Sequence, residues 1–120
     1  MTSKQKVVLV VDDESGIRKL VAALLAGQGF KALEAANGLE ALNLYGSYWS
    51  DLSLVITDVQ MPVMDGLEAV SRMRTISPDV PVILMTGAAG DLGQKLTGWQ
   101  PLRKPFKPAE LLERVRSVLK

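Results

Sequence analysis

Five side chains at the ends of segments that read as strands carry the functional groups with which this chain could do chemistry. They are three carboxylates, a hydroxyl and an ammonium: Asp12, Asp13, Asp58, Thr86 and Lys104. Adjacent like charges such as Asp12 and Asp13 repel each other at the edge of a core, so a positive group must compensate them. Clustered carboxylates suit a hard divalent cation, and Mg²⁺ typically takes one or two of them while it keeps waters for a phosphate oxygen. We therefore expect a Mg²⁺ site.

The composition excludes several other kinds of chemistry. The chain of 120 residues has no cysteine and no histidine. Disulfides, thiolate or imidazole metal ligands and serine–histidine triads are therefore absent. Any reaction must depend on carboxylates, hydroxyls, lysines and the backbone.

Length and charge indicate one globular domain over residues 1–120, with residues 1–5 expected to be a disordered leader. Apolar residues make up 48% of the chain and charged residues 22%, which is typical of a soluble fold. The formal net charge of +1 does not favour nucleic acid or a membrane surface as a direct partner. Since no leader-like or membrane-length apolar stretch is seen, we expect a cytoplasmic protein.

Short apolar runs alternate with amphipathic segments along the chain. Unbroken β-branched runs predict buried strands, and apolar residues at helical spacing predict helices. The predicted strands are residues 7–11, 30–35, 52–58 and 80–86, with a weak strand at 101–103. The predicted helices cover residues 15–28, three segments that begin near residues 37, 65 and 108, and a short stretch around 92–96.

Strands that alternate with helices predict a parallel sheet with helices on both faces and right-handed crossovers, which is a doubly wound α/β fold. In such sheets ligands bind beyond the carboxyl ends of the strands, near the point where the strand order reverses. The three acids, Thr86 and Lys104 stand at strand ends, so we expect them to meet at this edge.

Four motifs in this order resemble the receiver domain of two-component response regulators, which is a chemotaxis-regulator-like family. They are VLVVDDE, VITDVQMPVMDGLEAV, VPVILMTG and KPF, and the resemblance covers almost the whole chain. It implies a flavodoxin-like five-stranded sheet of order 2-1-3-4-5. The glycine-rich segment before Lys104 is short, so the fourth helix of the family is expected to be reduced.

The resemblance also implies roles for the residues at the strand ends. Asp58 would be the phosphoacceptor. Asp12, Asp13 and Asp58 would hold Mg²⁺, for which Mn²⁺ is a substitute, together with the backbone carbonyl of Gln60. Thr86 would donate to the phosphoryl group. Two further implications concern the last motif, where Lys104 would pair with the phosphoryl group and Pro105 would follow a cis peptide bond.

A receiver of this kind is a phosphoacceptor switch and not an enzyme in the usual sense. Its implied donor is a sensor histidine kinase or a phosphotransfer protein, and its output is an unknown partner or a linked effector domain. With Mg²⁺ it would also take a phosphoryl group from a small donor and lose it slowly by autodephosphorylation at Asp58. Phosphorylation would shift the conformation of residues 86–107 and so control partner binding.

One position departs from the family pattern. Receivers often carry a rotating aromatic residue three positions before the lysine, where this chain has Pro101. Proline cannot perform that rotation or donate a ladder hydrogen bond. We therefore expect output to depend on a rearrangement of residues 87–100, with Trp99 as its reporter.

Two other function classes stay open at this point. A receiver-like module could bind partners without phosphorylation. Pro101 argues mildly for this class, whereas the complete set of acids, with Thr86 and Lys104, argues against it. An aspartate-nucleophile phosphatase would end its first strand in Asp-x-Asp, whereas this chain has adjacent Asp12 and Asp13. A flavin site is disfavoured because the same acids would repel a phosphate there.

Overall fold

The computed structural model describes residues 5–87 and 96–119, and these form five strands and four helices. The strands are β1 (Val7–Val11), β2 (Lys31–Ala35), β3 (Leu52–Asp58), β4 (Val82–Thr86) and β5 (Leu102–Arg103). The helices are α1 (Ser15–Gly27), α2 (Gly38–Tyr48), α3 (Gly66–Ile76) and α4 (Pro108–Val118). Within this part of the chain, no helix is long and apolar enough to cross a membrane.

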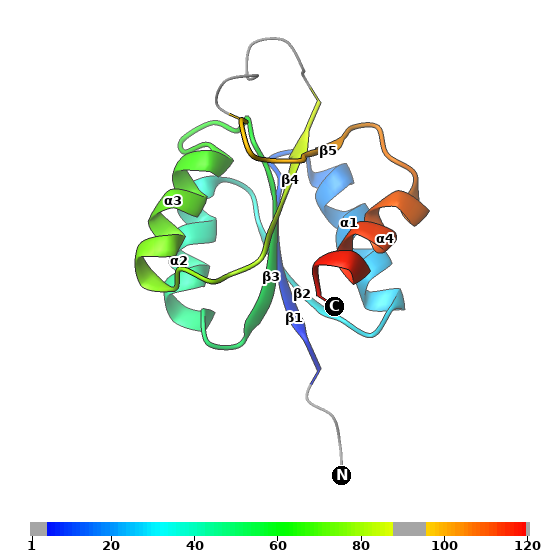
Figure 1. Cartoon of the computed structure of the whole chain (residues 1–120), viewed down its shortest axis with the longest axis horizontal. Coiled ribbons are helices and arrows are strands. Elements are labelled where there is room, and N and C mark those ends of the chain that lie inside the picture. Colours follow the sequence, from blue (N-terminus) through cyan, green and yellow to red (C-terminus); the bar gives the residue numbers. More distant parts are fainter. Residues whose placement is uncertain (1–4, 88–95, 120) are drawn as a thin grey trace.

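The strands form one parallel sheet of order β2-β1-β3-β4-β5, as predicted. Helices α1 and α4 cover one face, and α2 and α3 cover the other (Figure 1). The strand order reverses beside β1, and β1 and β3 are central, so their carboxyl ends lie together at one edge of the sheet.

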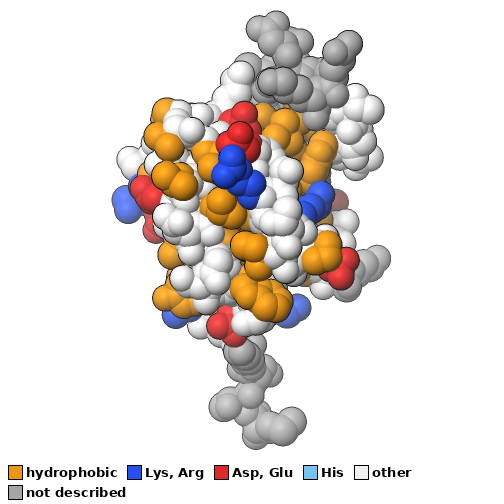
Figure 2. Space-filling model, turned by 90° about the vertical axis from the view of Figure 1, so that its left-hand side faces the viewer, with side chains coloured by type: hydrophobic (Ala, Val, Ile, Leu, Met, Phe, Trp, Pro, Cys, Tyr) orange, Lys and Arg blue, Asp and Glu red, His pale blue; other side chains and the backbone are white. Residues whose placement is uncertain are grey.

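The two faces of the sheet bury separate apolar clusters because side chains alternate along a strand. In β1, Val8 and Val10 pack with α1 and α4, whereas Leu9 and Val11 pack with α2 and α3. All four side chains are fully buried, as expected for a central parallel strand. Figure 2 shows the α2 and α3 side, where hydrophobic side chains are scattered among charged ones.

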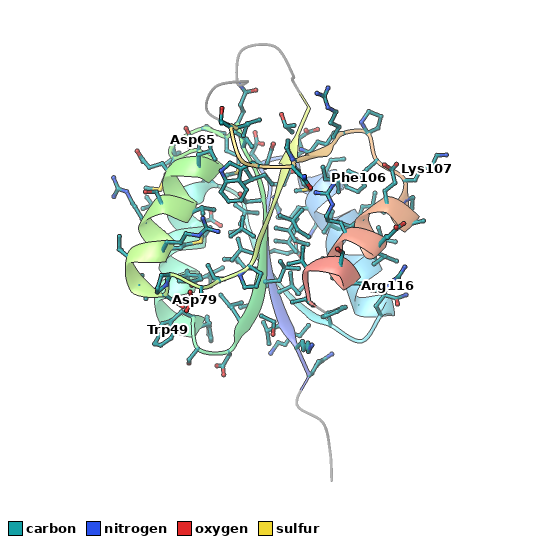
Figure 3. The ribbon with its side chains drawn as sticks, in the orientation of Figure 1. Trp49, Asp65, Asp79, Phe106, Lys107 and Arg116 are labelled. Atoms are coloured by element: carbon teal, nitrogen blue, oxygen red, sulfur yellow. The ribbon has the colours of Figure 1, made fainter. Side chains whose placement is uncertain are left out.

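Side-chain caps fix where two of the helices begin. The Asn37 side chain accepts a hydrogen bond of 2.9 Å from the Glu40 amide at the start of α2, and Asp65 accepts one of 2.8 Å from the Glu68 amide at the start of α3. Both side chains therefore act as N-caps, at the positions near which the sequence predicts these helices to begin. Figure 3 labels Asp65 at the start of α3, at the same end of the sheet as the carboxyl ends of the strands.

Element boundaries differ from the prediction at two strands. Strand β2 begins at Lys31 and not at Phe30, because the Phe30 amide donates to the Leu25 carbonyl (3.0 Å) in the turn that ends α1. Gly29 adopts a φ of 89° in that turn, a Schellman motif for which glycine is suited. Strand β4 begins at Val82, because the preceding Pro81 has no amide hydrogen to pair.

Three other expectations meet the limits of the described residues. The leader at residues 1–5 and the short helix around residues 92–96 fall almost entirely outside them, as does much of the segment 87–100. The weak strand near residues 101–103 is confirmed as β5, which is two residues long.

Candidate functional site

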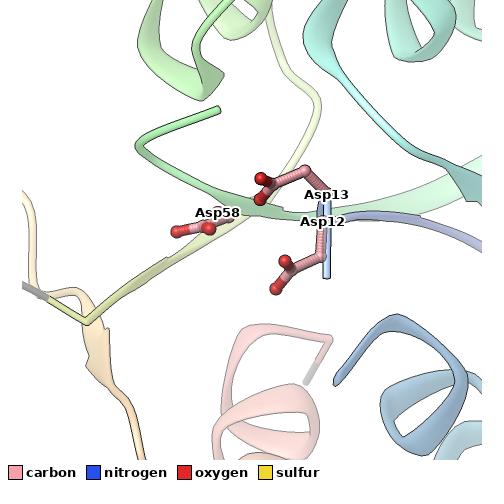
Figure 4. Close-up of side chains that lie close together, drawn as sticks. All are labelled: Asp12, Asp13 and Asp58. Carbon is pink, nitrogen blue, oxygen red and sulfur yellow. The ribbon is translucent and has the colours of Figure 1, made fainter. Parts of the chain in front are cut away.

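The register of the parallel strands brings the predicted acids together. Val11, the last residue of β1, is opposite Thr57 in β3. Asp12 and Asp58 are the residues that come immediately after this pair in the sequence. One carboxylate oxygen each from Asp12, Asp13 and Asp58 lie within 4.8 Å of one another (Figure 4). Asp12 is fully buried and Asp58 is 7% exposed, whereas Asp13 is exposed. The predicted acid cluster exists, and its chemistry suits a hard divalent cation.

Lys104 reaches this cluster from the end of β5. Its Nζ lies 2.7 Å from Oδ2 of Asp12 and 3.2 Å from Oδ2 of Asp58. The backbone places it there, because Thr86 in β4 is opposite Arg103, and the Lys104 amide donates to the Thr86 carbonyl (2.8 Å). The Lys104–Pro105 peptide bond is cis, as the resemblance implies. The ammonium therefore neutralises part of the acid cluster.

An open cleft of about 390 Å³ lies over the acids. Its described lining is Asp13, Glu14, Asp58, Gln60, Gly87 and Lys104. Thr86 is 5% exposed and ends β4, the strand next to β3, at this same edge. The cleft leaves room for a small anion beside Asp58, with Gln60 and Gly87 on its walls.

Burial and neighbouring charges raise the pKa of two groups at the site, each for a different reason. Burial raises the pKa of the Asp58 carboxyl above its usual 3.8, and Asp12 adds to this although Lys104 opposes it. Burial by itself would lower the pKa of the Lys104 ammonium, but its hydrogen bond to Asp12 and the charges of Asp58 and Asp12 together raise it. The charged form of Lys104 is therefore favoured, whereas the ionised form of Asp58 is disfavoured.

Three further residues support the site and were not predicted from the sequence. The Arg18 guanidinium donates to the Asp12 carbonyl (2.8 Å) and to Glu34 in β2 (3.1 Å). The buried Thr57 hydroxyl donates to the Asp58 carbonyl (2.9 Å). These bonds hold the backbone on both sides of the acid cluster. Gly66, which begins α3, approaches the same carbonyl closely: a Cβ there would lie 2.1 Å from the Asp58 oxygen.

Residues 8–116 match the family described as the response regulator receiver domain. The chain belongs to this family. The predicted resemblance and fold class are confirmed by this match and by the sheet order. Receiver domains take part in two-component signalling, and in this receiver domain Asp12, Asp13 and Asp58 cluster in space.

Two relatives illustrate the range of proteins that contain such a domain. The receiver domain is 40% identical to the probable transcriptional regulator ycf27 of Guillardia theta, over all of this chain and 47% of that protein. It is 36% identical to sporulation initiation phosphotransferase F of Bacillus subtilis (strain 168), over 93% of this chain and 92% of that protein. The chain thus spans about half the length of the ycf27 proteins that it matches.

Solved structures have the same fold. A chain of the CheX-CheY-BeF3-Mg+2 complex from Borrelia burgdorferi superposes with a TM-score of 0.85 at 30% identity, covering 96% of this chain and 90% of that chain. The receiver domain of the hybrid histidine kinase CckA gives a TM-score of 0.82 at 34% identity, covering 95% and 99%. The receiver domain is therefore similar both to a chain of the CheX-CheY complex and to the receiver domain of a hybrid histidine kinase.

Proposed function

We propose that this receiver domain is a phosphoacceptor switch in which Asp58 accepts a phosphoryl group from a histidine kinase or a phosphotransfer protein in the cytoplasm. One observation carries the proposal: a carboxylate at the end of β3 lies 3.2 Å from an ammonium and within 4.8 Å of two further acids, beside an open cleft. An acid that only caps a helix or faces solvent in a turn does not require several charged groups to converge in this way.

The residues present fit a divalent cation. The carboxylates of Asp12, Asp13 and Asp58 and the backbone carbonyl of Gln60 would hold Mg²⁺ or Mn²⁺, since all are hard oxygen ligands. When bound, Mg²⁺ supplies positive charge that lowers the repulsion between these acids and an incoming phosphoryl group. The neighbour from Borrelia burgdorferi is a complex that includes BeF3 and Mg+2, which supports this assignment.

In the transfer step, a carboxylate oxygen of Asp58 forms a bond to the phosphorus of the donor phosphohistidine. The bond between phosphorus and the imidazole nitrogen breaks, and the nitrogen keeps the electron pair. Lys104 and the Thr86 hydroxyl would contact the phosphoryl oxygens, because they lie at the ends of β5 and β4 beside Asp58. Lys104 would thereby loosen its contact with Asp12.

Phosphorylation would act on residues 86–107, and the contacts of Trp99 support its role as the reporter of this change. Its side chain packs with Val59 and Leu84, and Val59 directly follows Asp58. The Arg74 guanidinium of α3 lies 5.2 Å from the centre of the Trp99 ring. A shift at the end of β3 would therefore reach Trp99 through Val59, without an aromatic residue at position 101. An output partner or a linked effector domain would read this change.

The proposal is tested by the intact mass of the chain after incubation with acetyl phosphate, with and without Mg²⁺. The chain should gain one phosphoryl group only with Mg²⁺, and Asp58→Asn should gain none. Asp79→Asn is a matched control, because Asp79 is exposed and lies before β4, away from the cleft (Figure 3). No gain by the unmodified chain would overturn the proposal and favour a binding module that works without phosphorylation.

A further inference from the structure

The Glu14 side chain lines the cleft and does not cap helix α1. Glu14 is the N-cap residue of α1, yet its side chain makes no capping hydrogen bond. Its Oε1 lies 3.6 Å from Lys104 Nζ, and the side chain is 65% exposed. The carboxylate therefore points toward the ammonium that also holds Asp12 and Asp58.

Glu14 leaves the cleft with an excess of negative charge. Its described lining and floor hold four carboxylates, those of Asp12, Asp13, Glu14 and Asp58, and Lys104 is the one cation among them. A bound divalent cation brings the positive charges to three, one fewer than the negative charges. Without Glu14 the charges would balance. Counted over the described residues, an anion that approaches Asp58 therefore meets a net negative charge.

We propose that Glu14 is a specificity-determining residue that disfavours phosphoryl donors of high negative charge. The inference rests on the proposed function and adds a selection rule to it. Because Glu14 is exposed and only weakly paired, its charge acts on the approach of the donor and not on the stability of the fold.

Two small phosphoryl donors separate the effect of the donor's charge from the effect of the bond that forms at Asp58. Acetyl phosphate is a dianion at neutral pH; its bond from phosphorus to the acetyl oxygen breaks, and acetate leaves with the electron pair. Phosphoramidate is a monoanion at neutral pH; its phosphorus–nitrogen bond breaks, and the nitrogen leaves as ammonia with the electron pair and the one ionisable proton that the donor itself carries. Both donors form the same bond from an Asp58 oxygen to phosphorus. A difference between them on removal of Glu14 therefore reports the charge of the donor.

The experiment compares the unmodified chain, Glu14→Gln, Glu14→Lys and Glu113→Gln at saturating Mg²⁺ and low salt, by the rate of phosphoryl gain in intact mass. Glu113→Gln is the matched control, because it changes the net charge equally at an exposed position of α4 that does not line this cleft. With acetyl phosphate, Glu14→Gln should react about 2- to 5-fold faster and Glu14→Lys faster still. With phosphoramidate the gain should be under about 2-fold.

Salt and metal binding give two further readouts. The advantage of Glu14→Gln should shrink as ionic strength rises, since exposed charges are screened. Mg²⁺ binding without a donor, measured by calorimetry, should weaken about 2-fold in Glu14→Gln because one nearby negative charge is lost. Equal changes with both donors, an advantage that salt does not reduce, or the same gain in Glu113→Gln would overturn the inference. A wild-type chain that takes no phosphoryl group from either donor would overturn the proposed function itself.

Discussion

Gly66 of α3 lies against the backbone carbonyl of Asp58, so closely that a Cβ at position 66 would sit 2.1 Å from that oxygen. The Gly66 amide also donates to the Val59 carbonyl (2.8 Å), and the Thr57 hydroxyl donates to the Asp58 carbonyl. The start of α3 and the candidate phosphoacceptor are thus one packed unit. Their contact is made by backbone, which cannot rotate away.

Gly66→Ala should displace the end of β3 from α3. We expect a loss of about 2 kcal/mol or more in the free energy of unfolding, measured in urea, and a slower phosphoryl gain at Asp58. Gly46→Ala is the control, since Gly46 is exposed within α2 and a Cβ there meets no atom within 4 Å. That variant should gain up to about 1 kcal/mol. Similar stability changes in both variants would contradict the packing argument.

Asp58→Asn should change how stability depends on pH in the absence of metal. The folded chain holds a proton on Asp58 more tightly than the unfolded chain does, because burial raises its pKa above 3.8. The stability contributed by this group is thus present below about pH 3.8 and is lost as pH rises through the folded pKa. Relative to wild type, Asp58→Asn should gain stability as pH rises from about 4 to 7. A difference that stays constant across this range in urea titrations would argue against it.

Lys104→Met should make the fold depend on a metal ion. Asp12 is fully buried and would lose the ammonium 2.7 Å away, at a cost of about 3 kcal/mol in metal-free buffer. Since Mg²⁺ would supply the missing charge, it should raise the Tm of Lys104→Met more than that of wild type. Lys19→Met, at a side chain that is 69% exposed, should respond to Mg²⁺ as wild type does. An equal rise in all three proteins would show that Lys104 and the metal do not share a role.

Trp99 fluorescence should change on phosphorylation in a Trp49→Phe background, which leaves Trp99 as the single tryptophan of the chain. Trp49 is 46% exposed, so its replacement should cost little. The change should require Mg²⁺ and acetyl phosphate together and be absent in Asp58→Asn. An unchanged spectrum in a chain whose mass shows the phosphoryl group would remove Trp99 as the reporter of the switch.

Val63→Gly should stabilise the loop between β3 and α3. Val63 has a φ of 72° and is 76% exposed, so its β-branched side chain occupies a left-handed conformation with little packing in return. Glycine relieves this strain, and we expect a gain of up to about 1 kcal/mol in urea unfolding. Val63→Ala retains a Cβ and should gain less. A loss of stability in Val63→Gly would mean that the valine side chain makes a contact that stabilises the folded chain.

The strand pattern was enough to predict the fold and the place where the acids meet. Each strand of this parallel sheet ends at the same edge, so residues after strand ends, such as Asp12 and Lys104, converge whatever lies between them. The supporting contacts could not be predicted in the same way. Arg18 and Thr57 act through side-chain rotamers and distances across elements, and an arginine or threonine at those positions is ordinary in sequence. The starts of β2 and β4 depended on local hydrogen bonds, at Phe30 and Pro81, that hydropathy does not register.

The ion pair between Asp12 and Lys104 joins residues 92 positions apart, at the first and last strands of the chain. The carboxylates at the ends of β1 and β3 come from the first half of the sequence. The ammonium reaches them only when β5 pairs with β4 at the edge of the sheet. A nascent or cleaved chain that stops short of residue 104 has the acids without that counter-charge. The site is therefore complete only in a chain whose whole sheet has formed.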